Sequence, residues 1–140
     1  MSNPGPASTT TNHPSNLASN QALRLIASAQ GVNLNAVADT IASILVAGRV
    51  SVQSIIVTNA SVDLTTAQLA VYTGPSATGT AVKSAYALTG NSTSAKTVVT
   101  AATSTDAITG TPLYIRCTTV QGAAATADVF IYGYDLTFLP

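Results

Sequence analysis

Residues 113–136 read LYIRCTTVQGAAATADVFIYGYDL, and this stretch carries the clearest structural signal in the chain. In its first part, Ile115 and Cys117 alternate with Tyr, Arg and Thr residues. In its last part, Val129 and Ile131 alternate with aromatic residues. Because successive side chains of a β-strand point to opposite faces, each part predicts a strand with one buried face.

The segment between these two strands, QGAAATA (121–127), carries no charge, although connecting loops are normally polar and exposed. Two explanations are open at this point. Either the loop lies against a partner molecule, or it folds over the edge of its own domain. The first explanation makes four small residues candidate partner contacts: Gly122, Ala123, Ala124 and Ala125.

Alternation of the same kind recurs over most of the chain after residue 48. The predicted strands are bounded by Gly, Pro, Asn and Ser residues, which favour turns. The clearest candidates are residues 49–59, 67–73, 112–119 and 127–138, and the weaker ones are 80–88 and 96–101. Many short strands at such spacing predict an all-β sandwich or barrel.

Residues 18–47 fit two structures. Asn33 and Gly48 are suitable flanking residues for a helix. Apolar residues at helical spacing lie between them: Leu34, Val37, Ala38, Ile41, Ile44 and Leu45. Against a helix, TIASILV (40–46) holds four β-branched residues and alternates as a strand would. Periodicity therefore leaves helix and strand open for this segment.

The composition is unusually poor in charge. Charged residues make up 7% of the 140-residue chain, against about 25% in a typical domain. The five basic and five acidic residues cancel, and near-zero net charge favours association. The basic residues are too few and scattered for a nucleic-acid partner. No apolar run is long enough to predict a membrane span, so we expect no membrane contact.

The first 18 residues contain three prolines among Ser, Thr and Asn, with almost nothing apolar to bury. We therefore expect an extended N-terminal arm (1–18), disordered when free, followed by a single β-sandwich domain (19–140). The alternative, that the arm is a flexible terminus with no role, is equally open. If the arm contacts a partner, the candidate residues are Asn3, Pro4, Pro6 and His13. The arm lacks the regions of a signal peptide, so we expect the protein not to be secreted.

Residue types that carry catalysis are scarce. His13 is the only histidine, so a nucleophile–His–acid triad has no ordered base. The acidic residues show no metal-binding spacing, and a folded group of Asp39, Asp63 and Asp128 is the one such possibility. Residues 74–80 have the glycine spacing of a phosphate-binding loop but lack its lysine, which predicts a turn between strands. We expect no enzyme activity, no metal and no cofactor.

Two further residue types have a structural and a functional interpretation. The single Cys117 excludes an internal disulfide and is expected to be a small buried hydrophobe rather than a reactive thiol. The tyrosines either stack against sugars or, as is commoner, pack at sheet edges with the hydroxyl in water. They are Tyr72, Tyr86, Tyr114, Tyr132 and Tyr134.

Four segments carry a resemblance to a known family: GVNLNAVADT (31–40), SIIVTNASVDLTTAQLAVYTG (54–74), YALTG (86–90) and LYIRCTTVQGAAATADVFIYGYDL (113–136). They resemble small head cement or decoration proteins, which tailed bacteriophages and prophages encode beside the major capsid protein. The resemblance covers most of the chain beyond about residue 20 and contains no catalytic signature. It implies a jelly-roll-like antiparallel β-sandwich, in which residues 18–47 form early strands.

The resemblance also implies a function and partners. The protein would be made in the host cytoplasm and act in the virion, on the outer surface of the capsid. There it would bind the major capsid protein, bridge neighbouring capsomers and work as a homodimer. The alternative is a carbohydrate- or receptor-binding β-sandwich of a phage fibre or tail. That alternative predicts a concave face where Tyr72, Tyr132 or Tyr134 meet Asp or Asn side chains.

Overall fold

The protein is almost entirely β-structure. The computed structural model describes residues 23–46, 48–100, 108–109 and 112–137. The predicted arm (1–18) lies outside the described residues. The strands are β1 (Arg24–Asn33), β2 (Asp39–Ile41), β3 (Ser43–Ile44), β4 (Arg49–Thr58), β5 (Gln68–Tyr72), β6 (Ala81–Ala87), β7 (Thr97–Thr100), β8 (Ile108–Thr109), β9 (Tyr114–Thr119) and β10 (Thr126–Asp135). One helical turn, η1 (Pro75–Ala77), stands between β5 and β6.

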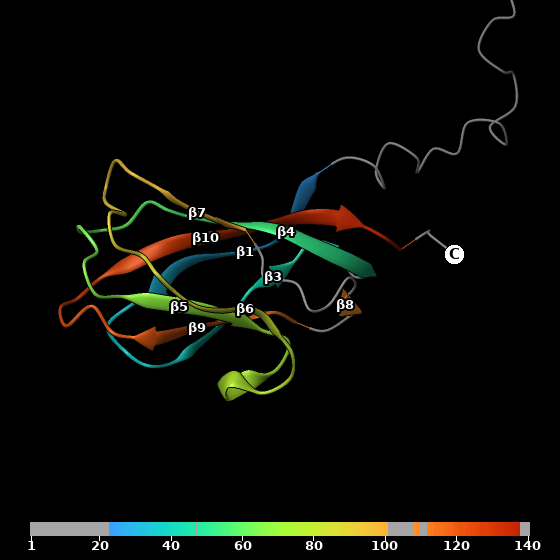
Figure 1. Cartoon of the computed structure of the whole chain (residues 1–140), viewed down its shortest axis with the longest axis horizontal. Helices are drawn as coiled ribbons and strands as arrows, with labels where there is room; N and C mark the ends of the chain where they lie inside the picture. The colour runs from blue at the N-terminus through green and yellow to red at the C-terminus, as the bar shows by residue number, and fades with distance from the viewer. Residues whose placement is uncertain (1–22, 47, 101–107, 110–111, 138–140) are drawn as a thin grey trace, which may run out of the picture.

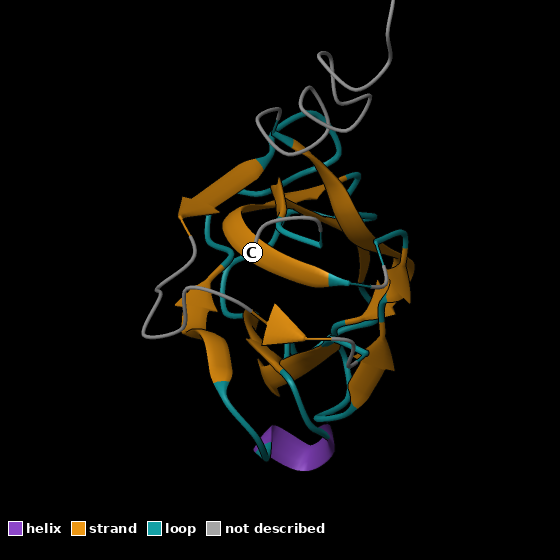
Figure 2. Cartoon of the chain, turned by 90° about the vertical axis from the view of Figure 1, so that its right-hand side faces the viewer, coloured by secondary structure: helices purple, strands orange, loops and turns teal. Residues whose placement is uncertain are grey.

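The strands form two antiparallel sheets that face each other as the upper and lower layers of Figure 1. Sheet A has the order β3-β1-β10-β4-β7, with β8 pairing with β4, and sheet B has the order β2-β9-β5-β6. The first and last long strands, β1 and β10, therefore lie side by side, and the chain crosses repeatedly between layers. Figure 2 shows the two layers from one end, with η1 outside the strands. The predicted all-β, jelly-roll-like antiparallel sandwich is confirmed.

The ambiguous segment forms strands, so its helical interpretation is wrong. Within it, β1 pairs with both β10 and β3, while β2 pairs with β9 in the other sheet. A helical stripe would have buried its apolar residues together. Instead Leu34 is buried, whereas Val37 and Ile41 are 55% and 62% exposed. The tertiary pairing of β2 with β9 and of β3 with β1 outweighs the local helical spacing.

A bulge explains why β4, one of the three ten-residue strands of sheet A, departs from strict alternation. In β4, Val50 and Val52 face the core, and so do Ile55 and Val57. The pairing of β4 with β10 shifts after Tyr132, which leaves Gln53 as the extra residue. An extra residue reverses which positions face inward, so both halves of the strand contribute to one core. In the sequence, the bulge coincides with the polar pair Gln53 and Ser54, which separates the two apolar halves of the strand.

The core lies between the sheets and contains the residues that alternation placed inside. Ile115 and Cys117 of β9 and Val129 and Ile131 of β10 are fully buried. Cys117 is a free cysteine, and burial raises the pKa of its thiol. The predicted burial of Cys117 is thus confirmed, and the raised pKa of a buried thiol disfavours the reactive thiolate. Ala70 of β5 is also buried, although its position in the alternation placed it outside.

At Gly133, beside this bulge, two strands approach so closely that no side chain fits. A β-carbon there would lie 2.1 Å from the backbone oxygen of Ser51. We expect Gly133→Ala to lower the free energy of unfolding by about 1–3 kcal/mol, because the backbone of β4 must shift. Ser84→Ala, on exposed edge strand β6, is the control and should change it by less than about 0.5 kcal/mol. Equal urea midpoints for the two variants would contradict this packing.

Candidate functional site

The described residues hold no group of three His, Cys, Asp or Glu side chains that could bind a metal ion. In this part of the chain no helix has the length and apolarity to cross a membrane. The three candidate aspartates lie apart. Asp39 pairs with Arg116, Asp128 accepts hydrogen bonds from the Gly31 amide and Asn59, and Asp63 is exposed on the β4–β5 loop. The structure therefore does not bring them together into one site.

The glycine-spaced segment 74–80 is a turn between β5 and β6, as predicted. It contains η1, in which the Ser76 amide donates to an Asp39 carboxylate oxygen. Asp39 also accepts from Arg116 at 2.8 Å. These contacts hold the turn against the outer side of sheet B. The amide is thus engaged by the chain's own carboxylate rather than directed at a phosphate.

The Asp39 carboxyl is stabilised in its charged form. Partial burial raises its pKa, but the hydrogen bond from Ser76 and the adjacent Arg116 guanidinium outweigh this, and the net pKa lies below its ordinary value. Arg116 and Asp39 are 22% and 16% exposed at their side chains, so solvent screens the pair only in part. The pair ties β2 to β9 and to the turn at once.

The β9–β10 loop lies at the left end of the sandwich in Figure 1, and its Gln121 joins it to the loop between β4 and β5. Its Oε1 accepts from the amides of Thr65, Thr66 and Ala67 at 3.1–3.3 Å. Its Nε2 donates to the Asp63 backbone oxygen and to Thr65 Oγ1. One side chain thus fixes the 63–67 segment to the β9–β10 loop. Sequence reasoning did not single out Gln121, although it is the only long polar side chain in an alanine-rich loop.

The alanine-rich loop divides between surface and core. Gly122, Ala123 and Ala124 are exposed. Ala125 is 3% exposed, because its carbonyl accepts from the Leu34 amide and draws the chain inward. The predicted partner contact at Ala125 is therefore corrected: this residue contacts its own core. The second explanation, in which the loop folds over its own domain, holds for Ala125, and contact of Gly122, Ala123 and Ala124 with a partner stays a prediction.

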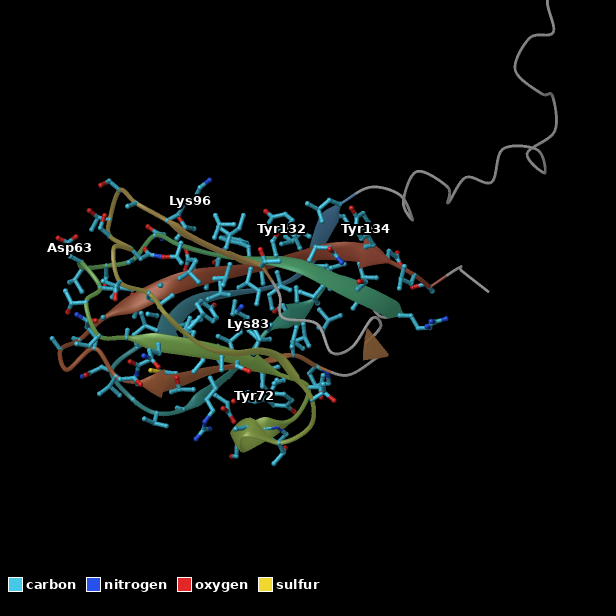
Figure 3. The ribbon with its side chains drawn as sticks, in the orientation of Figure 1. Asp63, Tyr72, Lys83, Lys96, Tyr132 and Tyr134 are labelled. Carbon is cyan, nitrogen blue, oxygen red and sulfur yellow. The ribbon has the colours of Figure 1, made fainter. Side chains whose placement is uncertain are left out.

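The remaining candidate contacts, Asn3, Pro4, Pro6 and His13, lie outside the described residues. For the tyrosines, Figure 3 places Tyr132 and Tyr134 on the outer side of sheet A and Tyr72 on the outer side of sheet B. They therefore do not converge on one concave face. Tyr86 packs against the core instead, and burial raises the pKa of its hydroxyl.

The outer side of sheet A carries large uncharged side chains in register. Across neighbouring strands, Phe130 of β10 lies opposite Ile56 of β4, and Ile56 lies opposite Val98 of β7. In the next row, Tyr132 lies opposite Leu25 of β1. Tyr134 continues the β10 series. We call this surface the sheet A face, defined by Leu25, Ile56, Val98, Phe130, Tyr132 and Tyr134.

The sheet A face combines predicted and unpredicted residues. Alternation placed Phe130, Tyr132 and Tyr134 on the outer side of their strand, and the structure confirms this. It did not reveal that Ile56 and Val98 extend the row, because their adjacency depends on strand order. An outer sheet face is usually polar, so this apolar row needs an explanation. Other exposed large apolar side chains of the described residues lie outside it: Leu23, Val37, Ile41, Leu45 and Val62.

Comparisons with known proteins do not assign the chain to a family. No protein-family model matches the sequence, and no curated protein matches it either. The surfaces described above and the resemblance of the sequence segments are therefore the indications of function that the chain offers.

Because Gln121 holds the 63–67 segment, we expect Gln121→Ala to lower the free energy of unfolding by about 1–2 kcal/mol, since three amides lose their acceptor. Hydrogen exchange at residues 65–67 should accelerate. Gln30→Ala is the control, since Gln30 is exposed and makes no side-chain hydrogen bond with a described residue. Unchanged hydrogen exchange at residues 65–67 in Gln121→Ala would show that the Gln121 side chain does not hold this segment.

The Asp39 contacts predict a dependence of stability on pH. Because the folded-state pKa is lowered, the stabilisation is fully present above the pKa of an unfolded aspartate, about 3.9. It is lost as the pH falls through the lower folded-state pKa. We therefore expect the free energy of unfolding to fall below about pH 4, and to fall less steeply in Asp39→Asn. Identical acid profiles for the two proteins would refute this role of Asp39.

Proposed function

We propose that the protein is a structural virion protein, a capsid cement or decoration protein. In this role it binds the outside of a phage head and bridges neighbouring capsomers. The observation that carries the proposal is a sandwich with an uncharged apolar sheet face and no metal-ligating cluster among its described residues. The resemblance of four sequence segments to head cement proteins supplies the choice of partner, the major capsid protein.

The charges of the described residues support a contact made by apolar burial and neutral hydrogen bonds. Arg24 pairs with Asp135, and Arg116 pairs with Asp39, so these charges are satisfied within the chain. Charged residues are depleted at interface cores, and this chain has few to exclude. The small exposed residues 122–124 give a partner close access to the backbone at the loop end.

Such a protein stabilises a shell by mass action. It binds the assembled shell and not the separated subunits, so the assembled state is favoured. Contacts with two capsomers reinforce each other, because the second forms at high effective concentration. Individually weak contacts, repeated over the shell, therefore suffice.

A second candidate is a carbohydrate- or receptor-binding module of a fibre or tail. The observation in its favour is the aromatic series Phe130, Tyr132 and Tyr134 along one strand, since such rings stack on sugars. The position of Tyr72 on the other sheet removes one of the residues that this candidate expected.

The proposed function predicts where the protein is found in purified particles. Quantitative gels of separated heads and tails should place it with the heads, in hundreds of copies. Washing in about 1 M salt, where the Debye length is about 3 Å, should release little of it, because few ion pairs are available for screening. A few copies with the tails would refute the cement function and favour the second candidate. Release by moderate salt would refute contact by apolar burial.

A further inference from the structure

A hollow lies between the β4–β5 loop and the β6–β7 loop, and we call it the loop hollow. It is lined by residues 63–65 of the first loop and 89–94 of the second, and its volume is about 460 Å³. Figure 3 places Asp63 at the left end of the sandwich. Pockets that hold small molecules typically measure about 300–1,000 Å³, so the loop hollow has room for one small ligand. It lies outside the sheet A face, because none of its residues belongs to a strand of sheet A.

The walls of the loop hollow are held together by hydrogen bonds between the two loops. The Leu64 amide donates to the Asn91 backbone oxygen at 2.8 Å. The Thr89 hydroxyl donates to the Thr65 backbone oxygen at 3.2 Å. Gln121 holds the first loop in place as well. A site with fixed walls loses less conformational entropy when a ligand binds.

The side chains of the loop hollow offer oxygen atoms and no positive charge. Asp63 is exposed, and its carboxylate makes no hydrogen bond or ion pair with a described residue. Thr93 is also exposed, and its hydroxyl makes no hydrogen bond with a described residue. A carboxylate only accepts hydrogen bonds, whereas hydroxyls both donate and accept. None of the described lining residues is basic, so the Asp63 charge disfavours an anionic ligand.

Asn91 adds a buried acceptor to this lining. The residue is fully buried, and its Nδ2 donates to the Val57 backbone oxygen of β4 at 2.8 Å, which fixes the side chain. Its Oδ1 is buried and has no hydrogen-bond partner among the described residues. Such acceptors are rare in native proteins, because an unmade hydrogen bond is unfavourable. A ligand hydroxyl supplies the missing donor, directly or through one water molecule.

A sugar ring matches this combination of groups. Two adjacent ring hydroxyls can donate to one carboxylate, and hydrogen bonds to a charged acceptor are the stronger ones. The methyl groups of Thr65, Thr89 and Thr93 suit the C–H groups of the ring. A calcium ion matches less well, because it takes about six to eight oxygen ligands and the described lining holds a single carboxylate.

We propose that the loop hollow binds a neutral saccharide, with Asp63 accepting from two ring hydroxyls and Thr93 forming a further hydrogen bond. The inference goes beyond the proposed function and does not depend on it, because the loop hollow is separate from the sheet A face. It also differs from the aromatic site of the second candidate, since none of the described residues that line it is aromatic. We expect a Kd of about 1 mM, because a monosaccharide is small and no aromatic ring stacks on it.

NMR titration of the isotope-labelled full chain tests the site. The probes are glucose, galactose, mannose and N-acetylglucosamine, each added to about 50 mM, well above the expected Kd. At least one of these sugars should shift the amide signals of residues 63–65 and 89–94, and the shifts should saturate.

Two variants test the residues that the proposal names. Asp63→Ala should abolish saturation over the same range, because the charged acceptor is lost. Thr93→Val removes a hydroxyl and keeps a methyl group, and it should raise Kd about threefold. Thr100→Val is the matched control: Thr100 is exposed on β7, outside the loop hollow, and this variant should bind as the wild type does.

The same spectra establish that each variant is folded. The absence of a saturable shift with all four sugars would overturn the inference, and so would shifts confined to residues outside the loop hollow. Unchanged binding in folded Asp63→Ala, or an equal loss of binding in Thr100→Val, would also overturn it. Calcium chloride is titrated in parallel. A response of the loop hollow to calcium and to none of the sugars would replace the saccharide site by a cation site.

Discussion

The structure depends on the pairing of β10 with both β1 and β4. β10 is the last of the described strands in the chain, yet it lies in the middle of sheet A, between β1 and β4. Its inward residues Val129 and Ile131 are fully buried against the other layer. Gly133 permits its close approach to β4, where a β-carbon would meet the Ser51 backbone. Without β10, β1 would lose its main pairing partner, and the core would lose the strand that covers it on the sheet A side.

The alternation that directs Val129 and Ile131 inward directs Phe130, Tyr132 and Tyr134 outward. A single strand therefore closes the fold and supplies three aromatic side chains to the outer side of sheet A. Sheet B has its own cover in the η1 turn, which the Asp39 carboxylate holds in place. The asymmetry between the two faces is a consequence of this arrangement. It is also the feature on which the proposed shell contact rests.

The local alternation of residue types was sufficient to predict the strands and to predict which side of each strand is buried. The residues of β9 and β10 that alternate in the sequence are those that the core contains, and Cys117 is buried as its neighbours predicted. The physical reason is that a two-sided strand needs one apolar side, whatever its partner is. The resemblance to known proteins, rather than periodicity, decided correctly for strands in residues 18–47.

Features that depend on residues far apart in the sequence could not be predicted from the local pattern. The row from Phe130 through Ile56 to Val98 joins three strands whose order only the fold determines. Gln121 acts through amides in a separate loop, and Ala125 is buried because the distant Leu34 amide binds its carbonyl. Sequence composition indicated an uncharged surface but did not place it on one sheet.

Hydroxyl-radical footprinting of the protein free in solution and bound to purified phage heads tests the central claim, that the sheet A face contacts the shell. Radical labelling reports the solvent access of each aromatic side chain directly. The account predicts that Phe130, Tyr132 and Tyr134 are less reactive in the bound protein, while Tyr72 and Tyr114 of sheet B do not change. Equal reactivity in the two states, or protection confined to Tyr72 and Tyr114, would contradict it.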